Sequence, residues 1–246
     1  MTENNPVLKA AKKAVLLSLG GSVGKTMITT QILHPHMPDA RILCVDTTNE
    51  TAADFGIKNC EKLSGDEFNK TYHALMSAPG DVIVDVGGNK ECKEFMAGML
   101  AIDGSDEITT IIIPSSPTSK DQNCAIETIE QLIDDGVDKS KIKVIFTGTK
   151  NDTADEFAEL ISGMEENGLV PDLNLTIAFN DLFDEMIKCK ELCFDIVTDG
   201  TDYKEKAASR KKGDTTDYVS KLIRQRMARK TVWPNLQKVY QHLFKD

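Results

Sequence analysis

The sequence predicts an α/β protein in which a mostly parallel sheet lies between helices on both faces. Short apolar runs alternate with segments long enough for crossover helices, and several runs are apolar at consecutive positions, as buried parallel strands are. A glycine-rich turn joins the first run to a helical pattern. The 246 residues suffice for one such domain with a buried core. The expected strands cover residues 14–19, 41–45, 82–86, 108–113, 142–147 and 173–179.

The turn after the first apolar run has the composition of a phosphate-binding loop, or P-loop. Backbone N–H groups in such a turn, together with the start of the following helix, bind a triphosphate. Lys25 places a charge at the β and γ phosphates, and the Thr26 hydroxyl is placed to ligate Mg²⁺. With the parallel sheet, this loop predicts a three-layer P-loop NTPase fold. A glycine-rich turn with an incidental lysine is the alternative. The expected nucleotide-binding residues are Gly20, Gly21, Ser22, Val23, Gly24, Lys25, Thr26 and Met27.

The third apolar run ends in a carboxylate. Asp85 closes this run and is followed by Val86, Gly87 and Gly88. Ligands of parallel sheets bind beyond the carboxyl ends of the strands, which is where the P-loop falls. A carboxylate there would hold a magnesium-bound water, and the glycines would let a loop approach the γ-phosphate. We expect Asp85 to be a metal ligand, with a loop-capping aspartate as the alternative.

The loop resembles the deviant P-loop of the ParA/MinD family, whose pattern is KGGxGKT. Gly21, Val23, Gly24, Lys25 and Thr26 match this pattern. From residue 14 to residue 56 the chain also looks like StbB-type plasmid stability proteins, which are ParA-like NTPases associated with plasmid maintenance and conjugation. The resemblance implies ATP and Mg²⁺ as cofactors, a homodimer formed through the nucleotide face, and association with DNA or a DNA-bound adaptor protein.

The second apolar run ends at Asp46, which coincides with the first aspartate of the family's DxD motif. The resemblance implies that Asp46 faces the metal, so that Thr26, Asp46 and Asp85 form the metal set and Lys25 and Asp46 the catalytic set. Thr48 stands where relatives have the second aspartate, which positions the attacking water. A hydroxyl is a poor general base near neutral pH. We therefore expect slow Mg²⁺-dependent ATP hydrolysis, or hydrolysis that recruits Glu50, Asp46 or a partner.

Two further departures from the family pattern concern the nucleotide. Ser22 replaces a glycine, and Gly20 replaces the signature lysine that reaches across the dimer in relatives. Lys90 and Lys120 are candidate replacements for that lysine, against the ordinary alternative that both are solvated. Residues 146–151 follow the fifth expected strand, where relatives present residues to the adenine.

Charge divides the chain into an acidic body and a basic end. Residues 200–246 hold 12 Lys and Arg against 5 Asp and Glu, a balance of +7, which leaves −17 for residues 1–199 of the whole chain's −10. We expect an NTPase domain over residues 1–199 and a basic helical extension over residues 200–246. Contacts with DNA or an anionic surface should fall on the extension. The alternative is that the extension docks on the acidic body of its own chain.

Two patterns bear on location and on the cysteines. No apolar run approaches the roughly twenty residues that span a bilayer, and the first residues lack the order of a secretory signal, so we expect a cytoplasmic protein. The six cysteines are scattered, which favours reduced thiols over a zinc site at Cys189 and Cys193.

Three functions follow from these patterns. The first is a ParA-like ATPase or switch in plasmid stability, DNA positioning or conjugative transfer. The second is a MinD-like switch with weak or no ATP hydrolysis, whose basic end contacts a membrane surface or a protein. The third is a kinase-like enzyme acting on a small substrate, for which the sequence offers no acceptor motif.

Overall fold

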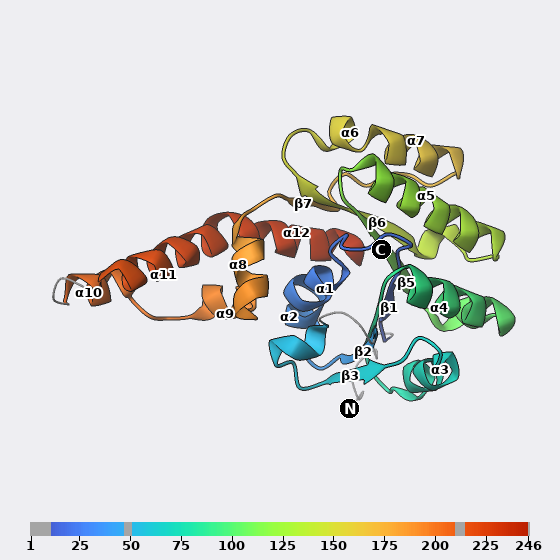
Figure 1. Ribbon diagram of the computed structural model, residues 1–246, viewed down its shortest axis with the longest axis horizontal. Helices are drawn as coiled ribbons and strands as arrows, with labels where there is room; N and C mark the ends of the chain where they lie inside the picture. The colour runs from blue at the N-terminus through green and yellow to red at the C-terminus, as the bar shows by residue number, and fades with distance from the viewer. Residues whose placement is uncertain (1–10, 47–50, 210–214, 246) are drawn as a thin grey trace, which may run out of the picture.

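The computed structural model describes residues 11–46, 51–209 and 215–245. Within these ranges, seven strands form one sheet in the order β3-β2-β4-β1-β5-β6-β7, and every neighbouring pair is parallel. Figure 1 shows the sheet surrounded by helices, which confirms the predicted α/β class. The strands are β1 (Lys13–Leu16), β2 (Arg41–Val45), β3 (Cys60–Leu63), β4 (Val82–Val86), β5 (Thr110–Ser115), β6 (Ile142–Thr149) and β7 (Thr176–Ala178).

Strands β2 and β4 match their predicted runs, β1 ends three residues earlier than predicted, at Leu16, and β5 and β6 end two residues later than predicted. Two differences are larger. Strand β3 was not predicted, because it lies at the edge of the sheet and carries Glu61 and Lys62 between Cys60 and Leu63. An edge strand has only one neighbour and need not be apolar. The other difference is that β7 is shorter than the predicted run, since Leu173 and Phe179 lie outside it and are exposed.

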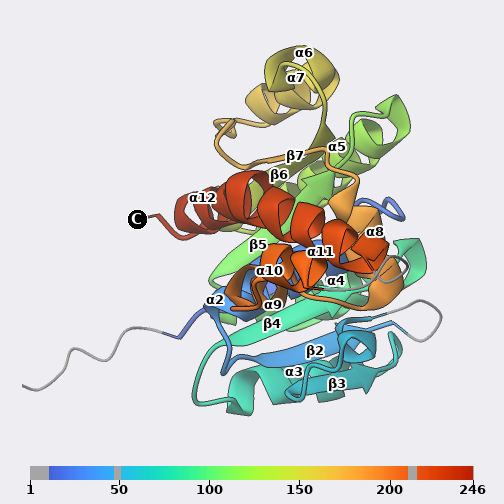
Figure 2. The same cartoon turned by 90° about the vertical axis from the view of Figure 1, so that its left-hand side faces the viewer.

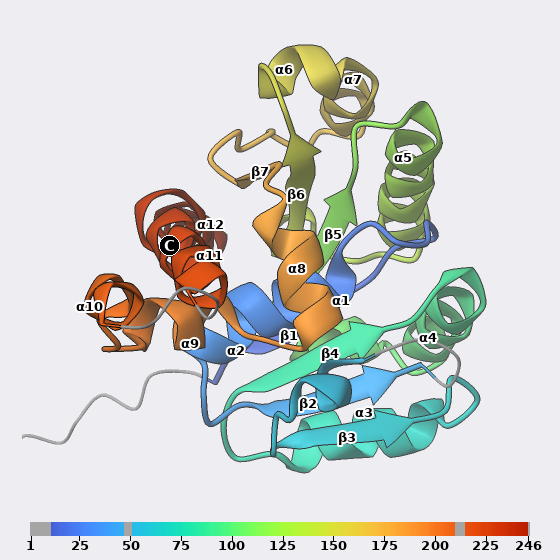
Figure 3. The same cartoon turned by 60° about the vertical axis from the view of Figure 1, so that its left-hand side comes forward.

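Helices cover both faces of the sheet (Figure 3). The α-helices are α1 (Lys25–Ile28), α2 (His34–His36), α3 (Phe68–Ser77), α4 (Asn89–Ala101), α5 (Ser119–Asp134), α6 (Thr153–Glu156), α7 (Ala158–Glu166), α8 (Leu182–Cys189), α9 (Cys193–Thr198), α10 (Tyr203–Ala208), α11 (Thr215–Met227) and α12 (Trp233–Leu243). Two π-helical segments, η1 (Thr29–Leu33) and η5 (Ala228–Val232), continue α1 into α2 and α11 into α12. Short 3₁₀ turns lie at η2 (Ala52–Phe55), η3 (Gly104–Glu107) and η4 (Lys139–Lys141).

Alternation along the strands builds a separate core on each face. Val15 of β1 belongs to the core that includes residues of α3, α4, α5 and α7, whereas Leu16 belongs to the core that includes residues of η1, α8 and α12. Both side chains are fully buried. A strand sends successive side chains to opposite faces, so each strand serves both cores. This arrangement fixes β1 at the centre of the sheet and holds the loop after it between the two helical layers.

The C-terminal helices form one continuous rod whose two halves differ in environment (Figures 1 and 2). Helix α12 packs on the sheet, because Leu236, Val239 and Leu243 are buried in the same core as β1. His36 stacks between the rings of Trp233 and Tyr240, at centroid distances of 5.1 and 4.2 Å. Helices α10 and α11 extend away from the sheet. The division of the chain at residue 199 stays a prediction.

Within the described ranges, none of the helices combines the length and apolar character needed to cross a lipid bilayer. The six cysteines are all unbridged.

Candidate nucleotide-binding site

The predicted P-loop connects the carboxyl end of β1 to the start of α1. Two of its residues have a left-handed backbone: Gly24, with φ 95°, and Ser22, with φ 59°. Glycine adopts this region readily, whereas a residue with a Cβ atom is strained there. The loop therefore turns back on itself to begin the helix at Lys25, and the strain at Ser22 falls where the related pattern has glycine.

One local hydrogen bond and two from surrounding elements, α4 and β6, hold the backbone of the loop. The Gly20 N–H donates to Ser18 Oγ at 3.0 Å, and the Asn89 side chain donates to the Leu19 carbonyl at 3.2 Å. Thr147 of β6 donates to the Val23 carbonyl at 3.2 Å. These contacts fix the loop before any ligand binds, which is the preorganisation that an anion site requires.

Lys25 is a buried cation at the base of the site. Its residue is 9% exposed, and its ammonium donates to the Gly20 carbonyl at 3.4 Å. Burial lowers the pKa of Lys25, and the nearby carboxylates of Asp85, Asp46 and Glu91 oppose this effect. A buried ammonium with few fixed partners is costly. A phosphate in the loop would add a counter-charge in direct contact with the Lys25 ammonium.

Asp85, at the end of β4, is also buried. Its Oδ2 atom has no hydrogen-bond partner among the described residues. Burial raises the pKa of the Asp85 carboxyl to about 6. Lys25 and the hydroxyls of Thr26 and Thr29 oppose the increase, and the charge of Asp46 adds to it. A buried carboxylate oxygen without a partner indicates a position where a cation or an ordered water would bind.

Asp46, at the end of β2, lies against the backbone of Gly87. Its residue is 8% exposed. A Cβ atom at residue 87 would lie 2.7 Å from Asp46 Oδ2, a contact too short for any side chain. The Gly87 N–H also donates to the Val45 carbonyl at 2.8 Å. The glycine after β4 thus allows the carboxylates of two neighbouring strands to share one edge of the sheet.

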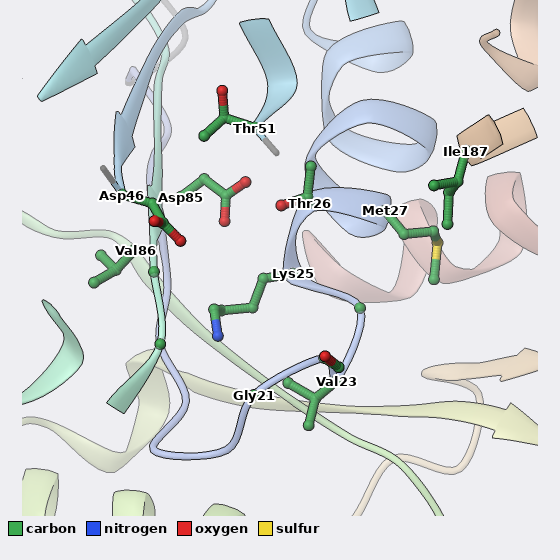
Figure 4. Close-up of a pocket in the computed structure, with 14 residues that line it drawn as sticks. Gly21, Val23, Lys25, Thr26, Met27, Asp46, Thr51, Asp85, Val86 and Ile187 are labelled. Atoms are coloured by element: carbon green, nitrogen blue, oxygen red, sulfur yellow. The ribbon is translucent and has the colours of Figure 1, made fainter. Parts of the chain in front are cut away.

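These groups surround a cavity of about 400 Å³ (Figure 4). In the view of Figure 4, Asp46 and Asp85 lie on one side of Thr26, and Met27 and Ile187 lie on the other. The volume falls in the range of small-molecule sites, roughly 300–1,000 Å³. The lining residues are Gly21, Ser22, Val23, Gly24, Lys25, Thr26, Met27, Asp46, Thr51, Asp85, Val86, Gly87, Gly88 and Ile187.

The cavity brings together nearly all of the predicted site residues. Gly20 is the exception, because it contributes its carbonyl to Lys25 and does not line the cavity. Thr48 and Glu50 lie outside the described residues. Neither of the candidate replacement lysines lines the cavity, and the Lys90 ammonium lies 3.7 Å from Glu94 on its own helix.

Sequence reasoning missed two residues that line the cavity, Thr51 and Ile187. Thr51 forms a capping box with Asp54 at the start of η2, a local pattern that the sequence contains. Ile187 comes from α8, and no local signal connects it to the loop. Residues 146–151, expected near the adenine, do not line the cavity, although Thr147 supports the loop.

The oxygen donors at this edge suit Mg²⁺. The donor set comprises the Thr26 hydroxyl and the carboxylates of Asp46 and Asp85, and Asp85 Oδ2 is buried without a hydrogen-bond partner in the part of the chain that the structure describes. Mg²⁺ takes oxygen ligands and usually keeps several waters beside one or two carboxylates and the phosphates of a substrate. In the described part of the chain, no cluster of three or more His, Cys, Asp or Glu side chains could hold a metal alone. The residues therefore fit a magnesium ion that arrives with a nucleotide.

Comparison with known proteins places the fold. The sequence matches no protein-family model and no curated protein. The structure is similar to the MinD cell division protein of Aquifex aeolicus, with a TM-score of 0.55 and 14% identity over 90% of this chain and 98% of that one. It is also similar to MinD of Pyrococcus horikoshii complexed with Mg-ADP, with a TM-score of 0.53 and 12% identity over 96% of this chain and 97% of that one.

A third similar structure is the MinC:MinD complex of Aquifex aeolicus, with a TM-score of 0.52 and 14% identity over 74% of this chain and 86% of that one. At such identities the likeness is one of fold. The chain therefore has the three-layer α/β fold of the MinD structures.

Proposed function

We propose that this chain is a cytoplasmic, Mg²⁺-dependent, ATP-binding switch of the ParA type that acts in plasmid stability, DNA positioning or conjugative transfer. The observation that carries the proposal is the convergence of Lys25, Asp46 and Asp85 around Thr26 in one cavity. The sequence resemblance over residues 14–56 supports the plasmid role.

Each residue has a separate task in this proposal. The Lys25 ammonium neutralises the β and γ phosphates, and the loop N–H groups hold their oxygens. The Thr26 hydroxyl and the carboxylates of Asp46 and Asp85 hold Mg²⁺, which neutralises charge on the phosphates during hydrolysis. Asp46 is the carboxylate proposed to orient the attacking water. Since phosphoryl transfer depends on positioning and charge, a missing group slows turnover while binding survives.

The proposed partners follow from charge. Exposed basic side chains on α11 and η5 include Lys221, Arg226, Arg229 and Lys230. We assign DNA or a DNA-bound adaptor to this surface, and a second copy of the chain to the nucleotide face. A related observation concerns MinD, which is found in complex with MinC.

Calorimetry with Mg²⁺ and a non-hydrolysable ATP analogue tests the binding site. Lys25→Ala should weaken binding by at least about tenfold, because it removes a charge from the phosphates. Lys93→Ala is the matched control, since Lys93 is an exposed lysine of α4 outside the cavity. Unchanged affinity in Lys25→Ala would refute the site.

One observation favours the second candidate function, a switch that contacts a membrane surface or a protein. Val219 and Ile223 of α11 are 40% and 53% exposed, next to the basic side chains. An amphipathic basic helix of this kind can lie on an anionic bilayer.

Co-sedimentation with DNA and with anionic liposomes at two salt concentrations separates the two functions. Binding to DNA should weaken steeply with salt and with Arg226→Ala, because neutralised phosphates release counterions. Binding to liposomes should depend instead on Ile223, so that Ile223→Ser abolishes it and salt changes it little.

A further inference from the structure

The cavity has a charged side and an apolar side. The proposed metal set lies at Asp46 and Asp85, so the γ-phosphate belongs on that side. A nucleotide held by the loop then directs its ribose and base toward the opposite side, where Met27 and Ile187 line the wall (Figure 4). Neither of these side chains carries an N–H or O–H group. Ile187 is 38% exposed, so part of its aliphatic surface is open to a ligand in the cavity.

Helix α8, which carries Ile187, is fixed to the helix that follows the P-loop. The side-chain amide of Gln31, in η1, donates to the Glu191 carbonyl at 3.1 Å and accepts from the Cys193 N–H at 2.7 Å. Gln31 is 1% exposed. Both of its bonds go to the link between α8 and α9. A buried amide that satisfies two backbone groups holds that link in one position.

A second set of contacts holds α8 from the side of α11. The Arg224 guanidinium forms ion pairs with Glu185, at 3.1 Å, and with Glu191. The Lys190 ammonium lies 5.6 Å from the ring centroid of Phe55, in the turn η2 that follows Thr51. Helix α8 is therefore braced at its C-terminal end, and the position of Ile187 at the cavity is preset.

We propose that Met27 and Ile187 form a platform for the nucleoside, and that the cavity binds purine nucleoside triphosphates with little discrimination between adenine and guanine. This inference rests on the proposed nucleotide site. Adenine and guanine differ in hydrogen-bonding groups and hardly in size, so packing against aliphatic side chains favours both bases similarly. Strong discrimination requires polar groups that pair with one base and are left unpaired by the other.

The platform can be tested by measuring how tightly the full chain binds three probes in the presence of Mg²⁺. The probes are inorganic tripolyphosphate, an ATP analogue and a GTP analogue. The affinities for the two nucleotides should agree within about fivefold, and both should exceed that for tripolyphosphate. A preference for ATP of about a hundredfold or more would overturn the inference. Equal affinity for tripolyphosphate and the nucleotides would overturn it too, while leaving the phosphate site intact. Failure to bind any of the three refutes the phosphate site itself.

Ile187→Ala tests the side chain directly. It should weaken the binding of both nucleotides by about three- to tenfold, since truncation removes apolar area that the base and ribose would bury. The binding of tripolyphosphate should not change. Ile102→Ala is the matched control, because it makes the same change at an exposed isoleucine outside the cavity. Wild-type nucleotide affinity in Ile187→Ala would contradict the platform.

Gln31 is a positioning residue in this scheme. Gln31→Met keeps the length of the side chain and removes both bonds to the α8–α9 link. This variant should weaken the binding of both nucleotides and leave the binding of tripolyphosphate unchanged, because other contacts hold the loop backbone. A parallel loss of tripolyphosphate binding would show that Gln31 supports the loop rather than α8.

Discussion

Asp46 and Gly87 lie so close together that a Cβ atom at residue 87 would stand 2.7 Å from the Asp46 carboxylate oxygen and 2.9 Å from its carboxyl carbon. The two residues follow neighbouring strands, β2 and β4, whose parallel register carries both to the same edge. The position of a proposed metal ligand is thus limited by the backbone of the next strand.

Gly87→Ala should displace the Asp46 carboxylate and weaken Mg²⁺-dependent nucleotide binding by at least about tenfold, since a site tolerates little misplacement. Gly88→Ala is the matched control. It lies in the same cavity wall, but the nearest atom to its Cβ is a flexible Glu91 oxygen 4.0 Å away. Calorimetry with the ATP analogue, with and without Mg²⁺, measures the effect. Equal affinities in the two variants would mean that Asp46 is not a metal ligand.

The buried carboxyl of Asp85 predicts a pH-dependent stability in the absence of ligands. Its pKa is raised from 3.8 to about 6, so between these values the folded chain holds a proton that the unfolded chain has released. The contribution of Asp85 to stability therefore falls as pH rises through this window, by about 3 kcal/mol in all.

Asp85→Asn should remove this dependence and raise the free energy of unfolding at pH 8, while it weakens Mg²⁺-dependent nucleotide binding. Urea unfolding at pH 4.5 and pH 8 measures the first effect, and calorimetry measures the second. Asp66→Asn, at an exposed loop position, is the control. A destabilised Asp85→Asn variant at pH 8 would show that the charge is already compensated in the free protein.

The sequence predicted most of the fold and of the site because both depend on local patterns. Buried parallel strands are apolar at consecutive positions, and a P-loop is continuous in the chain, so Lys25 and Thr26 were identified together with their neighbours. Asp85 was found because a carboxylate at the end of an apolar run marks the sheet edge. The edge strand β3 was missed because its side chains are partly solvated and its pattern is weak.

Residues that only the tertiary fold brings to the site could not be predicted from the sequence. Ile187 reaches the cavity because α8 crosses from the end of β7, and its distance in sequence from Met27 hides that contact. The same holds for Gln31, whose amide pairs with Glu191 and Cys193 about 160 residues away. The sequence around a buried polar side chain such as Gln31 gives no indication of which backbone groups it will bond to.

The strained residue of the P-loop offers a test of loop geometry. Ser22 has φ 59°, and a non-glycine residue in this left-handed region costs about 1–2 kcal/mol of folding free energy. Replacing it with glycine removes this strain, but glycine loses more conformational entropy on folding, which offsets about half of the gain. Ser22→Gly should therefore raise the free energy of unfolding by about 0.5–1 kcal/mol in urea titrations. Gly24→Ala should lower it by more than about 1 kcal/mol, since φ is 95° there. A destabilised Ser22→Gly variant would mean that the serine is held by compensating contacts.

The contrast between α11 and α12 predicts which part of the basic C-terminal segment the fold requires. Leu236 of α12 is fully buried against the sheet core, whereas Ile223 of α11 is 53% exposed. Leu236→Ala should lower the free energy of unfolding by about 2–5 kcal/mol, because a buried leucine loses its packing and leaves a cavity. Ile223→Ala should change it by less than about 0.5 kcal/mol, as surface substitutions usually do.

Urea unfolding of both variants gives the comparison. Equal, small losses would mean that α12 forms a separate unit, as a boundary at residue 199 requires. A large loss at Leu236 alone would make α12 part of the NTPase core and leave α10 and α11 as the extension available to a partner.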